Sequence, residues 1–170
     1  MTPYSKKGFS LIEMLIYIAV VSLMMILLVN TVLSIINAYS DLRLARNIET
    51  SATVSFDRMI REIRGAKSVD MINTTFGVNP GRLVLNTTDS SGANTTIDFY
   101  VDSNLLKVKE GGVYIGPLTS STTIITNLTY TLLSTTTSKA VKIDMGLSST
   151  RKSTTKTGTF HDTVILRGSY

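Results

Sequence analysis

The most distinctive pattern in the chain is a long apolar run near the N-terminus. From Phe9 to Val29 the sequence reads FSLIEMLIYIAVVSLMMILLV, with Glu13 as its only charged residue. As a helix this run would be about 31 Å long, close to the roughly 30 Å hydrocarbon core of a bilayer. Helices of soluble domains usually keep a polar stripe, which this run lacks. The pattern therefore predicts a membrane-spanning helix at residues 9–29.

The helical pattern continues beyond the apolar run. Apolar residues recur at spacings of three and four from Leu33 to Ile63, which is typical of an amphipathic helix. Neither Gly nor Pro occurs between Phe9 and Arg64, and Gly65 is the first strong stop signal. We expect one uninterrupted helix from Phe9 to about Ile63, in which residues 30–66 form the amphipathic continuation.

The remaining sequence, residues 67–170, has the alternation and turn punctuation of β-strands. Strands are expected at Arg82–Thr87, Thr95–Val101, Leu105–Glu110, Val113–Ile115, Thr123–Leu133, Ala140–Leu147 and Phe160–Arg167. The Ser/Thr-rich stretches are expected to be loops, namely Thr87–Thr96, Ser134–Ser138 and Ser148–Thr159. The predicted fold class is α+β, with the long N-terminal helix packed on an antiparallel sheet that has one buried face.

Composition argues against enzyme chemistry. The chain has no cysteine, so thiol nucleophiles, disulfides and most zinc sites are excluded. Its one histidine, His161, adjoins Asp162 in an expected strand, where a surface pair is the simpler interpretation. No Gly-rich phosphate-binding loop is present. We therefore predict no catalytic residue, no cofactor and no enzymatic activity.

Two charged clusters are candidate binding sites. Asp98, Asp102, Asn104 and Glu110 surround an expected hairpin and carry oxygen ligands that suit calcium, but their spacing matches no calcium loop, so no metal is predicted. The formal net charge is +5, and the C-terminal quarter is the basic end. Its basic loop (Arg151, Lys152 and Lys156) lacks interleaved aromatic residues, so nucleic acid is not an expected partner.

The residues before the apolar run distinguish it from an ordinary signal peptide. A signal peptide is cleaved after its apolar core, whereas here Lys6, Lys7 and Gly8 directly precede the run. Positive residues beside a membrane helix stay in the cytoplasm, so Lys6 and Lys7 orient the chain with its C-terminal part exported. Ordinary secretion remains an alternative, because Ala38 and Ser40 provide small residues downstream of the run.

The string KKGFSLIE at residues 6–13 resembles the type III signal of type IV pilins and type II secretion system pseudopilins. The resemblance implies that a membrane prepilin peptidase cuts between Gly8 and Phe9 and methylates the new amino group of Phe9. It also implies that Glu13 pairs with the amino terminus of a neighbouring subunit and sets the axial register. A carboxylate in an apolar segment costs a few kcal/mol, so a compensating partner is expected on physical grounds as well.

Parts of the downstream sequence resemble particular subfamilies. The helix end FDRMIREIR at residues 56–64, and the run Ile125–Tyr130 followed by Ala140–Ile143, resemble J-type pseudopilins and W-type minor pilins. Glu13 argues against the K-type tip subunit, which typically lacks that carboxylate. The absence of helix-breaking Gly and Pro, common in the apolar segment of major pilins, favours a minor pilin or pseudopilin.

These observations define the expected protein. It would be a structural subunit of a type IV pilus or type II secretion-like filament, with a leader cleaved at residues 1–8. Its expected partners are the prepilin peptidase, the membrane and other pilin or pseudopilin subunits. It would cross the bacterial inner membrane once, with a cytoplasmic N-terminus, before entering the filament. The alternative is an exported binding or adhesion domain held by an uncleaved signal anchor.

Overall fold

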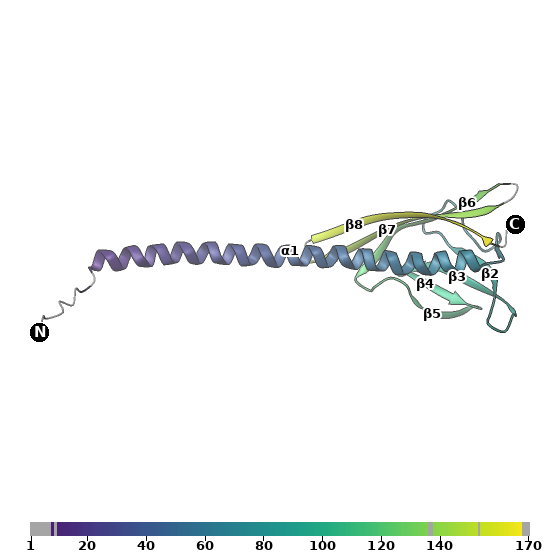
Figure 1. Ribbon diagram of the computed structural model, residues 1–170, viewed down its shortest axis with the longest axis horizontal. Coiled ribbons are helices and arrows are strands. Elements are labelled where there is room, and N and C mark those ends of the chain that lie inside the picture. The colour runs from purple at the N-terminus through teal and green to yellow at the C-terminus, as the bar shows by residue number, and fades with distance from the viewer. Residues whose placement is uncertain (1–7, 9, 136–137, 153, 168–170) are drawn as a thin grey trace, which may run out of the picture. The chain divides into compact units, whose positions relative to one another are not determined.

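A long helix opens the structure. The computed structural model describes residues 8, 10–135, 138–152 and 154–167. Within these, α1 runs from Leu11 to Gly65, 55 residues without a break (Figure 1). The predicted uninterrupted helix is confirmed, and it ends at the predicted stop glycine, two residues after Ile63.

The chain forms two compact units, Met1–Ser40 and Asp41–Tyr170. In the first unit α1 exposes its apolar side chains, and in the second unit α1 packs against strands. The side chains of α1 that are buried share one face, following spacings of three and four; they are Leu44, Ile48, Ser51, Ala52, Ser55, Met59 and Ile63.

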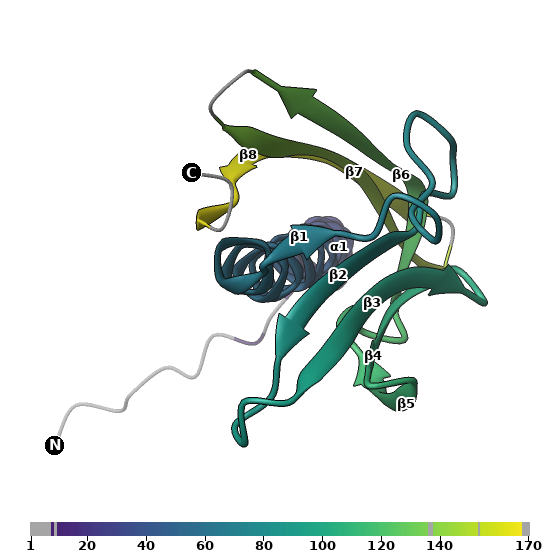
Figure 2. The same cartoon turned by 90° about the vertical axis from the view of Figure 1, so that its right-hand side faces the viewer.

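The strands of the second unit form two antiparallel sheets. The five-stranded sheet has the order β1-β2-β3-β4-β5 and the three-stranded sheet the order β6-β7-β8. Their bounds are β1 Ser68–Val69, β2 Leu83–Thr88, β3 Asn94–Asp102, β4 Leu105–Glu110, β5 Val113–Pro117, β6 Thr123–Ser134, β7 Lys139–Arg151 and β8 Thr154–Ile165. The Asp41–Gly65 part of α1 lies between the two sheets (Figure 2). The predicted α+β class is confirmed, with the strands divided between two sheets where one was expected.

Tight turns set the register of the five-stranded sheet. Ser103 and Asn104 both have positive φ, 54° and 61°, and connect β3 to β4 as a two-residue hairpin turn. Gly111 and Gly112, with φ of 56° and 82°, connect β4 to β5 in the same way. Such turns match the right-handed twist of the strands they join. The expected hairpin at this position is confirmed.

The expected loop at Ser148–Thr159 is wrong. There, β7 continues to Arg151 and β8 begins at Thr154, and these two residues face each other across the turn. A Ser/Thr-rich composition does not by itself indicate a loop, because threonine is β-branched and fits a pleated strand well. The serines at the end of β7 are also buried, and Ser149 Oγ donates a hydrogen bond to the Thr122 carbonyl at 2.8 Å.

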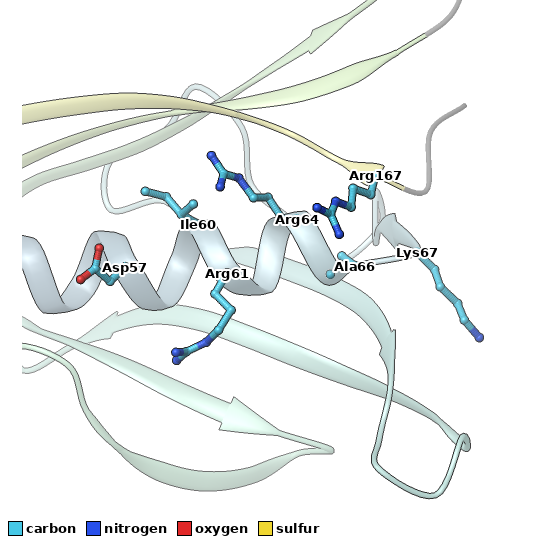
Figure 3. A pocket seen from close by; sticks show the side chains of 8 residues that line it. Asp57, Ile60, Arg61, Arg64, Ala66, Lys67 and Arg167 are labelled. Atoms are coloured by element: carbon cyan, nitrogen blue, oxygen red, sulfur yellow. The ribbon is translucent and has the colours of Figure 1, made fainter.

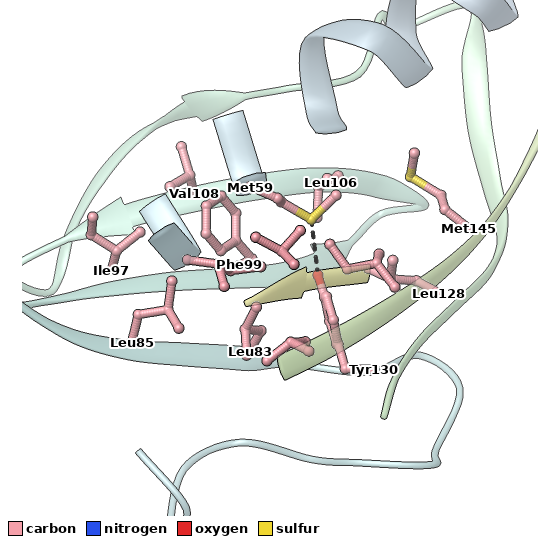
Figure 4. Close-up of a cluster of buried hydrophobic side chains, with 14 of the residues drawn as sticks. Met59, Leu83, Leu85, Ile97, Phe99, Leu106, Val108, Leu128, Tyr130 and Met145 are labelled. Carbon is pink, nitrogen blue, oxygen red and sulfur yellow. Dashed lines mark hydrogen bonds between the residues drawn. The ribbon is translucent and has the colours of Figure 1, made fainter. Parts of the chain in front are cut away.

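The core is built from the buried face of α1 and one face of each sheet (Figure 4). Leu83, Phe99 and Leu106 come from the five-stranded sheet, and Tyr130 comes from the three-stranded sheet. The Tyr130 hydroxyl donates to Met59 Sδ at 3.5 Å, which gives this buried group a partner on the helix. Burial raises the pKa of Tyr130, so its hydroxyl stays protonated.

Truncating a core leucine should destabilise the second unit far more than truncating an exposed one. Leu106→Ala removes a side chain that is 0% exposed and should lower the free energy of unfolding by about 2–5 kcal/mol. Leu133→Ala is the matched control, since Leu133 is 46% exposed, and should cost less than about 1 kcal/mol. Chemical denaturation of the full chain in detergent micelles, followed by tyrosine fluorescence, measures both. Equal effects of the two variants would contradict the core described above.

Candidate membrane-anchoring and assembly segment

The residues predicted to be functional lie just before α1 and in its first turn. Ser10 directly precedes the helix, and its carbonyl accepts hydrogen bonds from Glu13 N at 3.0 Å and Met14 N at 3.1 Å. Serine is a favoured residue at this N-cap position. Gly8 is exposed, and a side chain added there would meet nothing within 4 Å. Lys6, Lys7 and Phe9 lie outside the described residues.

Glu13 lies in the first turn of α1. A carboxylate is favoured there because the N-terminal end of a helix is its positive pole. The Tyr17 hydroxyl, four residues further on, donates a hydrogen bond to Glu13 Oε1 at 3.3 Å. A carboxylate has two oxygens that accept about four hydrogen bonds, so Glu13 retains capacity for a cationic donor. Tyr17 was not among the predicted site residues, although its spacing of four residues places it beside Glu13 on a helix.

The helix after Glu13 exposes an apolar surface on all sides. From Leu11 to Val29 the large apolar side chains are each more than half exposed. Among the described residues, α1 is long and apolar enough to cross a membrane, judged by length and composition. An apolar surface of this extent is unstable in water and must be covered by lipid or by other protein.

Two hydroxyl side chains, one within and one just after this segment, have hydrogen-bond partners in the helix itself. Ser22 Oγ donates to the Ile18 carbonyl and Thr31 Oγ1 to the Leu27 carbonyl, each at 2.8 Å. This back-bonding removes the cost of carrying an unsatisfied hydroxyl into an apolar medium. These two hydroxyls are therefore compatible with a bilayer or a filament core.

The carboxylates considered for calcium do not converge. Asp98 accepts two hydrogen bonds from Arg82, at 2.9 and 2.7 Å, and this carboxylate raises the pKa of Arg82. Asp102 faces Lys107, whose ammonium lowers the pKa of Asp102. Glu110 pairs with Arg58. Each carboxylate thus faces its own cation, and the described residues contain no group of three or more acidic or histidine side chains placed to hold a metal.

The other polar residues singled out from the sequence lie at the surface. His161 and Asp162 are exposed neighbours in β8, and Asp162 Oδ1 accepts a hydrogen bond from Thr163 N at 2.7 Å. Arg151 and Lys152 lie at the β7–β8 turn, whereas Lys156 pairs with Asp41 at 3.4 Å. One of the three basic residues predicted to form a loop is therefore paired within the chain.

Comparison with known proteins gives one match. The family model described as the prokaryotic N-terminal methylation motif matches residues 4–29. No curated protein and no solved structure matches the chain. The chain thus carries a prepilin-type N-terminal segment, and this motif implies processing by a prepilin peptidase and assembly with other pilins. The match supports a pilin-like exported subunit of structural rather than enzymatic kind.

A charge placed in the apolar segment should weaken membrane association. Leu23→Arg puts a cation near the middle of the exposed apolar helix and should cost about 2.5–3.5 kcal/mol of insertion free energy. Leu42→Arg is the matched control, because Leu42 is equally exposed on α1 but belongs to the second unit. The fraction of chain resisting alkaline extraction from membranes should fall for the first variant and stay unchanged for the second. An unchanged fraction for both would count against a bilayer-spanning role.

Proposed function

We propose that the chain is a minor pilin or pseudopilin, a subunit that is inserted in the bacterial inner membrane and then built into a filament through α1. One observation carries the proposal: the methylation motif at residues 4–29 includes both the basic leader and the exposed apolar start of α1. A membrane anchor alone would require the helix but not the motif. The combination is what a subunit needs to pass from lipid into a helical filament core.

The proposed processing site is the bond between Gly8 and Phe9. Two features support it: Gly8 is exposed, and α1 begins only at Leu11, so the backbone at Gly8 is not held in the helix. Cleavage would remove residues 1–8 and leave Phe9 as the new amino terminus, where methylation would follow. The remaining chain would comprise the anchor at 9–29, the amphipathic helix at 30–66 and the exported sheet domain at 67–170.

Glu13 is the proposed assembly residue. Cleavage creates a cationic amino group one helical turn from Glu13, and each subunit would then offer one cation and one carboxylate at the same depth. Pairing between neighbouring subunits removes the cost of both charges in an apolar environment. The Glu13 oxygens not engaged by Tyr17 can accept from such an amino group.

Lys6 and Lys7 are the proposed orientation signal. Positive residues beside a membrane span are retained in the cytoplasm, so the leader would stay inside and the sheet domain would be exported. The uninterrupted α1 supports a minor pilin or pseudopilin over a major subunit, since a segment without Gly or Pro has no built-in point of melting. The J-type and W-type subfamilies are the proposed assignments.

Intact mass spectrometry of the membrane-extracted chain tests the processing. In cells that contain a prepilin peptidase, the mass should correspond to a chain starting at Phe9 with one added methyl group. Gly8→Val should give the full-length chain, because a branched side chain replaces the glycine at the cleavage site. A wild-type mass that still includes Met1 would refute the proposal in favour of an uncleaved anchor carrying an exported binding domain.

Removing the carboxylate should separate insertion from assembly. Glu13→Ala should leave membrane insertion intact and reduce incorporation into sheared filaments by about tenfold or more, which corresponds to about 1.4 kcal/mol per subunit contact. Glu49→Ala is the control, because Glu49 is an exposed carboxylate on the second unit's part of α1. Immunoblots of the membrane and filament fractions measure both steps. Wild-type incorporation of the Glu13 variant would remove the pairing role.

A further inference from the structure

The edge of the three-stranded sheet at β8 differs from the other sheet edges of the structure. β1 has 2 residues, and β5 has 5 and ends at Pro117. The outer edge of β6 is covered in its middle, because Gly77 N and Gly81 N donate to its carbonyls at Tyr130 and Leu128. β8 has 12 residues, contains no proline, and no described strand pairs with its outer edge. Proteins usually protect long edge strands, since their free N–H and C=O groups are templates for another strand.

A groove runs between this edge and α1. Two cavities of about 630 and 750 Å³ lie along it, and both are lined by Asp57 and Ile60, so they are continuous. Figure 3 shows Ile60 and Arg64 pointing from α1 toward β8, while Arg167 extends back from the end of β8. The floor of the groove is apolar where Phe56 and Ile60 approach Phe160.

The groove has a defined beginning. At Gly158 β8 passes so close to α1 that an added Cβ would lie 3.0 Å from Ile48 Cγ2. Just before it, Lys156 pairs with Asp41 and ties the two elements together. Beyond Gly158 the first cavity is lined by Thr159–Asp162 of β8, and the second by Arg167, which follows the strand. The part of β8 beyond Gly158, Thr159–Ile165, is seven residues and is long enough to pair with a short strand.

The two ends of the groove carry opposite charges. Glu49 lies nearest the Gly158 end, Asp57 and Asp162 follow along the same cavity, and within the described residues none of the three is in an ion pair. Asp57 also lines the second cavity. Arg64 and Arg167 line the other end, again without an ion pair to a described carboxylate, and Arg61 and Lys67 add to its positive potential. β8 and α1 run in the same direction here, so the acidic end comes first along both elements.

We propose that this groove binds an extended segment of a partner polypeptide, which adds to the three-stranded sheet by pairing antiparallel with β8. All strand pairs described in this protein are antiparallel, which favours that direction. In this direction the N-terminal end of the segment lies at Arg64 and Arg167 and its C-terminal end at Glu49. The segment should therefore be acidic at its start, apolar at alternate positions and basic at its end. This inference goes beyond filament assembly and does not depend on Glu13 or on cleavage at Gly8.

A peptide fits the groove better than a nucleic acid does. Strand addition would satisfy the free backbone groups of β8, and side chains at alternate positions would fill the apolar floor. A nucleic-acid strand would satisfy neither, and its phosphates would be repelled by the three carboxylates that line the groove. Opposed charges at the two ends select the direction of a peptide, which is the usual effect of electrostatic complementarity on specificity.

Fluorescence anisotropy with two labelled octapeptides tests the proposal on the full chain in dodecyl maltoside micelles. The first peptide, Asp-Thr-Val-Thr-Val-Thr-Lys-Thr, has the proposed charge order, and the second, Lys-Thr-Val-Thr-Val-Thr-Asp-Thr, has the same composition with the charges exchanged. The first should bind at least about tenfold more tightly. The Arg64→Glu/Arg167→Glu variant should abolish this preference, whereas Arg43→Glu/Arg46→Glu, which reverses two exposed charges of α1 outside the groove, should keep it.

Three outcomes would overturn the inference. Equal binding of the two peptides would show that the charges of the groove do not select a direction. Undiminished binding of the first peptide after N-methylation at alternate residues would show that it does not pair with β8. A twelve-nucleotide oligo-dT that binds and displaces the peptide at physiological salt would assign the site to nucleic acid. None of these results depends on whether the chain enters a filament.

Discussion

The fold depends on the burial of one face of α1 between two sheets that cannot be stable separately. Ile48, Ala52, Met59 and Ile63 form a row that both sheets share as their apolar partner. An isolated sheet of three or five strands would leave one apolar face in water. Ser51 and Ser55 are also buried on this face of the helix. The helix is therefore the common core of the second unit, and the sheets are joined through it.

The same helix meets two different environments with one backbone conformation. In the first unit the side chains of α1 are apolar all round and exposed, whereas from Leu44 onward only one face is apolar and it is buried. An α-helix is suited to this change because it satisfies its own backbone hydrogen bonds and needs no water to do so. The side-chain pattern alone decides which part is covered by the sheets and which part must be covered by lipid or neighbouring subunits.

Much of this arrangement could be predicted from the sequence because it depends on local periodicity. The continuous helix follows from the absence of Gly and Pro up to Gly65, and most strands follow from alternation. The division into two sheets could not be predicted from periodicity. It depends on the path of the chain between Pro117, where β5 ends, and Thr123, where β6 begins. The extension of β7 and β8 through Ser148–Thr159 was missed because hydroxyl-rich composition is shared by loops and by exposed strands.

The candidate sites also differ in whether they can be predicted from the sequence. The leader, Gly8 and Glu13 are contiguous in the chain, so their order alone indicates a prepilin segment, and the matched methylation motif agrees with it. Tyr17 was within reach of the same reasoning through its spacing from Glu13. The groove at β8 was not, because residues such as Arg64 and Arg167 are about a hundred positions apart and meet only in the folded chain.

The alignment of α1 with β8 also has a mechanical consequence. A tensile load applied along the Asp41–Gly65 part of α1 would act lengthwise on the row from Ile48 to Ile63, so its contacts with both sheets would resist together in shear. Contacts loaded in parallel share the force, whereas contacts opened one after another fail singly. The buried row therefore gives the second unit resistance to extraction of its own core helix, a property that suits a subunit held by one end under strain.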